Sequence, residues 1–63
     1  GYSKGEYIGH TKYGSYKMKK YFNGEIEKIT EIGNGSGEIP YSVRDGYICI
    51  DTAENTAFII NVK

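Results

Sequence analysis

The stretch "PYSVRDGYICID", residues 40–51, carries a clear β-hairpin signal. Asp45-Gly46 separates two short runs rich in apolar residues, and this dipeptide is typical of the two-residue type I′ turn of a β-hairpin. The turn fixes the pairing register, which places four apolar side chains on one face. These are Tyr41, Val43, Ile48 and Ile50. The opposite face carries Ser42, Arg44, Tyr47 and Cys49. A one-residue slip would mix the two faces, so register and polarity together predict this hairpin.

The hairpin extends into a third strand if residues 52–56 form a loop. Asn55 suits such a loop because asparagine tolerates positive φ. The expected cross-strand partners are Ile50 with Phe58 and Ile48 with Ile60. We therefore expect a three-stranded antiparallel meander with one buried face. Its predicted core residues are Tyr41, Val43, Ile48, Ile50, Phe58, Ile60 and Val62.

Asn23-Gly24 is a second hairpin signal, placed between residues 15–22 and residues 25–32. A two-residue turn there pairs Lys20 with Glu27, Met18 with Ile29, and Lys19 with Lys28. The first two pairs are favourable, whereas the two lysines repel each other. The isoleucines of the second run do not alternate cleanly, so we expect a β-bulge or a strong bend in that strand.

Two long, bent strands are the interpretation we favour for this half of the chain. The alternatives are a short helix over residues 15–23, with Ser15 as its N-cap, or a helix over residues 25–32. Before them, residues 6–10 predict one short strand. Residues 33–37, which are rich in glycine, lack the following helix and lysine that a phosphate-binding loop needs, so we expect a mobile connector.

Length and composition support an all-β fold. The chain has 63 residues, enough for a single small β domain over residues 1–63, and it contains nine Ile but neither Leu nor Trp. Isoleucine, valine and tyrosine suit a pleated, half-buried surface. Because a closed sheet has no exposed edges, we expect a small antiparallel barrel or a curled meander of five to six strands, SH3-like or OB-like, with at most one short helix.

The sequence predicts no enzyme, no metal site and no cofactor. His10 is the only histidine and Cys49 the only cysteine, so a nucleophile–base pair would need these two to meet in the fold. No spacing of metal ligands is recognisable. Three glutamates could share a strand face, but a domain of this size has little room for a ligand cleft of about 300 Å³ or more.

Charge is distributed unevenly although the formal net charge is zero. Residues 1–22 carry five Lys against one Glu, whereas residues 23–63 carry three basic residues against seven acidic ones. Lysine alternates with tyrosine in the first region, a pattern that suits phosphate contacts and base stacking. Single-stranded nucleic-acid binding is therefore our alternative function. The residues expected to carry it are Lys12, Tyr13, Tyr16, Lys17, Lys19, Lys20 and Tyr21.

Protein–protein contact is the function that the sequence favours. We expect a non-enzymatic binding module whose partner is an unidentified protein or a second copy of the chain. The predicted partner-binding residues are Arg44, Tyr47 and Ile59, on the face opposite the predicted core. The single Cys49 cannot form an intramolecular disulfide, which favours the cytoplasm. No apolar run is long enough for a membrane span, and a chain that starts at Gly1 is expected to be a processed or trimmed product.

Overall fold

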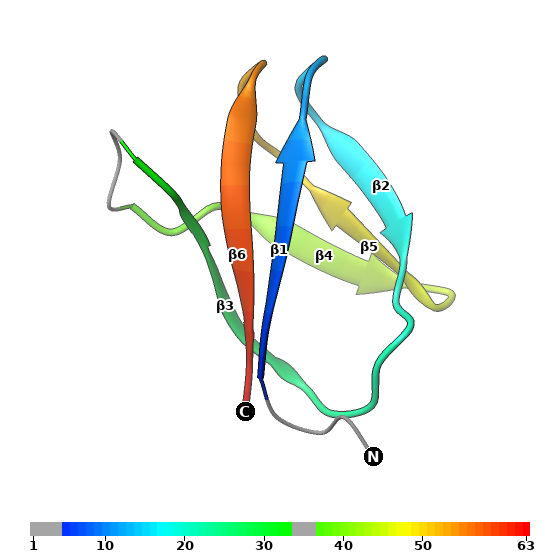
Figure 1. Ribbon diagram of the computed structural model, residues 1–63. Helices are drawn as coiled ribbons and strands as arrows, with labels where there is room; N and C mark the ends of the chain where they lie inside the picture. Colours follow the sequence, from blue (N-terminus) through cyan, green and yellow to red (C-terminus); the bar gives the residue numbers. More distant parts are fainter. Residues whose placement is uncertain (1–4, 34–36) are drawn as a thin grey trace.

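The computed structural model describes residues 5–33 and 37–63, which form six antiparallel β-strands in two three-stranded sheets (Figure 1). The strands are β1 (Gly5–Thr11), β2 (Tyr16–Lys19), β3 (Ile26–Glu31), β4 (Tyr41–Arg44), β5 (Tyr47–Ile50) and β6 (Thr56–Val62). Sheet A has the order β1-β6-β3, and sheet B has the order β2-β5-β4. This confirms the all-β prediction, and the described residues contain no helix. Of the glycine-rich connector, residues 34–36 lie outside the described residues.

The hairpin of β4 and β5 has the predicted register. Arg44 faces Tyr47 across the turn, and Val43 faces Ile48. Asp45 has φ 54° and Gly46 has φ 81°. A type I′ turn requires positive φ at both central residues, which explains why this dipeptide occupies the turn.

The core lies between the inner faces of the two sheets. Its buried apolar residues are Phe22, Ile29, Ile39, Ile48, Ile50, Phe58, Ile60 and Val62. The predicted core is therefore correct for β5 and β6 but wrong for β4. Tyr41 and Val43 remain 36% and 48% exposed, because β4 is an edge strand that sheet A does not cover completely.

The predicted meander is wrong in one respect: β6 does not pair with β5. It is the central strand of sheet A, where it pairs with β1 on one side and with β3 on the other. The chain changes sheet in the loop that contains Asn55, which has φ 52° as expected for this asparagine. Alternation of polar and apolar residues fixes which side chains point inward, but it does not fix which sheet a strand joins, since both sheets contribute to one core.

The predicted hairpin at Asn23-Gly24 is also wrong. β2 pairs with β5, and β3 pairs with β6, so Lys19 lies opposite Tyr47 and the repulsion with Lys28 does not arise. Both regions are nevertheless strands and neither is a helix. The expected bulge is confirmed by a register shift between Ile26 and Lys28.

The two sheets do not close into a barrel within the described residues, so the expected closure is not observed. At one side, the Tyr41 hydroxyl donates a hydrogen bond of 3.3 Å to the carbonyl of Ile26, so a side chain spans the gap between β4 and β3. At the other side, a crevice separates β1 from β2. In the part of the chain that the structure describes, no helix could cross a membrane.

Candidate binding faces

Each sheet presents a second, outward face, and the two outward faces differ in chemistry. Alternation along the strands of sheet A places nine side chains outward. These are Glu6, Ile8 and His10 of β1, Ala57, Ile59 and Asn61 of β6, and Lys28, Thr30 and Ile32 in or directly after β3. Four of the nine are apolar and lie on neighbouring strands.

We define the apolar face as Ile8, Ile32, Ala57 and Ile59. Ile8 is 75% exposed and lies directly opposite the half-buried Ile59. Ile32 is 40% exposed, and its backbone N–H donates to the carbonyl of Ala57 at 2.8 Å. Single exposed apolar side chains are common, but a group on adjacent strands is typical of a contact surface.

The outward face of sheet B is positively charged, and we call it the basic face. Its six side chains are Lys17, Lys19, Ser42, Arg44, Tyr47 and Cys49. Tyr47 lies on the central strand between Lys19 and Arg44, and Lys17 Nζ is 5.0 Å from the centroid of its ring. No carboxylate is among these six side chains. The basic face therefore combines three positive charges with one aromatic ring.

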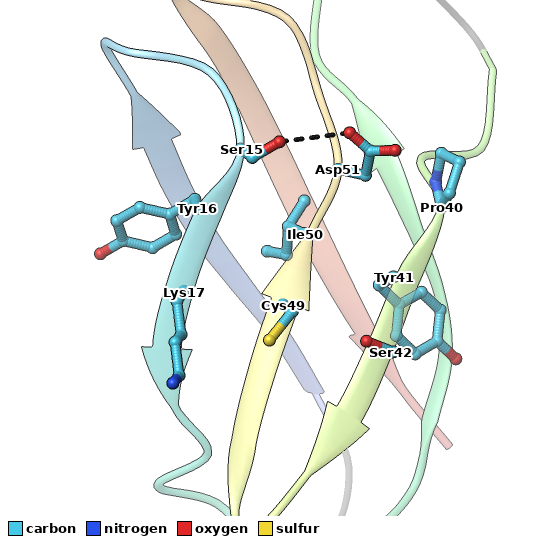
Figure 2. Close-up of a pocket in the computed structure, with 9 residues that line it drawn as sticks. All are labelled: Ser15, Tyr16, Lys17, Pro40, Tyr41, Ser42, Cys49, Ile50 and Asp51. Atoms are coloured by element: carbon cyan, nitrogen blue, oxygen red, sulfur yellow. Dashed lines mark hydrogen bonds between the residues drawn. The ribbon is translucent and has the colours of Figure 1, made fainter.

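Figure 2 shows an open hollow at one end of the basic face. Its volume is about 370 Å³, and it is open to solvent rather than enclosed. Cys49 lies between Lys17 and Ser42, and Tyr16 and Tyr41 form the margins. At one end of the hollow, the Ser15 hydroxyl donates a hydrogen bond of 3.2 Å to Asp51 Oδ1, which orients the carboxylate.

The hollow does not bring Cys49 and His10 together. Cys49 is in the hollow on sheet B, whereas His10 is on the outward face of sheet A, on the opposite side of the core. Among residues 5–33 and 37–63, no group of three or more potential metal ligands occurs.

The residues expected to bind nucleic acid are dispersed. Lys17 and Lys19 share the basic face, whereas Tyr16, on the other side of β2, is 39% exposed at the margin of the hollow, with its ring centroid 6.1 Å from that of Phe58. Lys20 Nζ donates to the carbonyl of Phe22 at 2.8 Å and is thus directed away from the basic face. The other three predicted residues lie in loops: Lys12 and Tyr13 between β1 and β2, and Tyr21 beside Tyr7.

The predicted partner-binding residues are divided between the two sheets. Arg44 and Tyr47 are cross-strand neighbours on the basic face, whereas Ile59 is at the centre of the apolar face. Sequence reasoning missed Ile8 and Ile32 as companions of Ile59. The alternation Tyr7–Ile8–Gly9 marks Ile8 as outward, but its position beside Ile59 depends on the pairing of β1 with β6.

The fold and the two faces define the class of this protein: a small, two-sheet, all-β protein with chemically different outer surfaces. Comparison with protein-family models, with curated proteins and with solved structures found no match for the chain.

Proposed function

We propose that the protein is a non-enzymatic binding module that makes protein–protein contacts through the apolar face. The observation that carries this proposal is the 75% exposure of Ile8 next to Ile59, at the middle of a long, regular antiparallel pair. Complete burial of one isoleucine side chain is worth about 1.5–3 kcal/mol. The fold does not gain this free energy from Ile8, but a protein that covers the face would.

The surroundings of the apolar face also suit a protein partner. Glu6, His10, Lys28 and Asn61 lie around it and alternate in charge and polarity. An apolar centre with a polar rim is the usual composition of a specific protein interface. We further propose a cytoplasmic location, since Cys49 is free and half-buried.

Differential capture tests the proposal. The immobilised wild type, an Ile8→Ser/Ile32→Ser variant and a Lys17→Gln/Lys19→Gln variant are exposed to an extract of the producing cells, and retained proteins are quantified by mass spectrometry. We expect at least one protein to be retained by the wild type and by the lysine variant but lost with the isoleucine variant. Retention that is the same for the wild type and the isoleucine variant would contradict the proposal.

Nucleic-acid binding is the second candidate function, and the basic face is the observation that favours it. Tyr47 offers an aromatic surface between Lys19 and Arg44, and the hollow lies next to it. Three phosphate contacts on a single strand give a salt slope of about −2, so affinity should fall about twentyfold between about 50 and 200 mM salt.

Titration of mixed-sequence single-stranded DNA and RNA at both salt concentrations tests this second function. Amide signals of Lys17, Lys19 and Tyr47 should shift at the lower salt concentration, and a Lys19→Gln/Arg44→Gln variant should bind more weakly. Unchanged amide signals on sheet B at the lower salt concentration would exclude the basic face as a nucleic-acid site.

A further inference from the structure

The two sheets have four edge strands, and three of them carry features that block pairing with another chain. β2 carries Lys17 and Lys19, and β4 follows Pro40 and carries Arg44. β3 contains the bulge, and its residue Thr30 forms an isolated antiparallel β-bridge with Glu38. Lysine, proline, bulges and covering segments are the usual means by which an edge is protected.

β1 has none of these features. Its seven residues, Gly5–Thr11, include no lysine and no proline, and they pair with β6 without a register shift. β1 is thus the longest edge strand in the described part of the chain and the one that is open to pairing.

The unpaired backbone groups of β1 can be assigned from the pairing of β6. The carbonyl of Ala57 and the N–H of Lys63 bond toward β3, so alternate residues of β6, including Phe58 and Ile60, bond toward β1. Their partners on β1 are Gly9 and Tyr7. The backbone groups of Glu6, Ile8 and His10 therefore point away from the sheet. Among the described residues, no further backbone hydrogen bond reaches these three.

A crevice of about 110 Å³, lined largely by aromatic and aliphatic side chains, lies directly beside this edge, between β1 and β2. Its walls include Tyr7, Met18, Tyr21 and Phe58. The Phe58 ring packs over Gly9, where a Cβ would lie 2.6 Å from the ring. The crevice has room for one aliphatic side chain, placed where a strand added to β1 would direct its inward residues.

We propose that β1 binds an extended segment of a partner protein by strand addition. The N–H and C=O groups of Glu6, Ile8 and His10 form the hydrogen bonds. An aliphatic side chain opposite Gly9 enters the crevice, an apolar side chain opposite Ile8 enlarges the apolar face, and a basic side chain lies opposite Glu6. This inference rests on the proposed function and specifies its partner as an extended, aliphatic segment with a basic residue.

A single strand fits this edge better than a second folded copy of the chain. Figure 1 shows β2 diverging from β1, so that sheet B extends past the free edge of β1. A folded copy that paired through its own β1 would bring its sheet B against the part of sheet B that extends past β1. An isolated extended segment carries no second sheet and would lie above that part.

Selection from a phage-displayed library of linear peptides of about ten residues tests the inference with the purified protein. We expect selected peptides to be aliphatic with a basic residue, and to protect the amides of Glu6, Ile8 and His10 from hydrogen exchange. His10→Pro removes an edge N–H and should weaken binding at least about tenfold, whereas the matched His10→Thr should stay within about twofold of the wild type.

Tyr21→Ser provides a second variant, because Tyr21 is 64% exposed and is not one of the buried core residues. It removes one wall of the crevice and should weaken peptide binding about threefold or more. Peptides that bind His10→Pro and Tyr21→Ser as tightly as the wild type would overturn the inference, and so would a library that yields no binder. If the retention of extract proteins still depends on Ile8 and Ile32 in either case, the proposed function stands and only the inference of strand addition is rejected.

Discussion

Sheet A and sheet B have the same number of strands and the same antiparallel pairing, yet their outward faces have opposite character. On sheet A, the outward residue at the middle of β6 is Ile59, and its neighbour Ile8 is largely exposed. On sheet B, the outward residue Tyr47 on β5 has cationic neighbours on both sides. The inner faces must be apolar for the protein to fold, so it is the outward faces that distinguish one role from another.

The edges differ in the same way. Both edges of sheet B carry lysine or arginine, whereas on sheet A only β3 does, through Lys28, and β1 carries neither. A charged face with charged edges is suited to water or to a polyanion. An apolar face beside an open edge is suited to another polypeptide. These differences support the proposal that sheet A, rather than sheet B, makes the protein contacts.

The largest effect is expected in the shared core, where the two sheets should be equivalent. Ile60→Ala on β6 and Ile48→Ala on β5 each truncate a fully buried side chain, so each should lower the free energy of unfolding by about 2–5 kcal/mol. A domain of 63 residues has a total of only about 3–9 kcal/mol. Urea unfolding followed by circular dichroism measures both. If one variant loses about 2 kcal/mol or more of its free energy of unfolding and the other loses less than about 1 kcal/mol, the sheets do not share a core.

A smaller effect is expected where β1 lies against Phe58. Gly9→Ala places a methyl group 2.6 Å from the Phe58 ring, so either the ring or β1 must move, at a cost of about 1–3 kcal/mol. Gly37→Ala is the matched control, because no atom lies within 4 Å of its added Cβ. Thermal unfolding of both variants provides the test. Equal stability of the two would show that β1 is not held as closely as described.

The exposed isoleucine should contribute little to folding. Ile8→Ser should change the free energy of unfolding by less than about 0.5 kcal/mol in dilute solution, because its side chain is 75% exposed. Ile59→Ser should cost about 1 kcal/mol, since Ile59 is half-buried. Chemical denaturation of the two variants measures both free energies of unfolding. If Ile8→Ser costs more than Ile59→Ser, Ile8 serves the fold and the apolar face loses its main support.

A similarly small effect is expected on sheet B. Lys17→Gln removes the contact of its ammonium group with the Tyr47 ring, which is worth about 0.5 kcal/mol at an exposed site. A double-mutant cycle with Tyr47→Leu isolates this coupling, and Lys19→Gln serves as the control on the same strand. A coupling of zero, or an equal one for Lys19, would contradict this description of the basic face.

Local features of the fold could be predicted from the sequence, whereas the assignment of strands to sheets could not. Asp45-Gly46 determines the register of β4 and β5, because only one register keeps their apolar residues together. Asn23-Gly24 gives a similarly strong signal, yet the strands on either side belong to different sheets. A turn signal shows where the chain reverses, but the partner of each strand depends on long-range packing.

The same limit explains why only some neighbours in the candidate sites could be predicted from the sequence. Arg44 and Tyr47 lie close to each other because one hairpin positions both. Ile59 is separated from them because β6 enters sheet A, and its true neighbours come from β1 and β3. Ile8 could be recognised as outward from alternation alone, but the apolar face requires a pairing across some fifty residues that no local pattern specifies.

Photo-cross-linking from one position on each sheet can show whether sheet A or sheet B contacts other proteins. A photoactivatable residue replaces Ile8 on sheet A in one variant and Arg44 on sheet B in another, and both are irradiated in an extract of the producing cells. We predict a discrete protein adduct from position 8 and none from position 44. An adduct from position 44 alone, or from neither position, would contradict the proposal that sheet A makes the protein contacts.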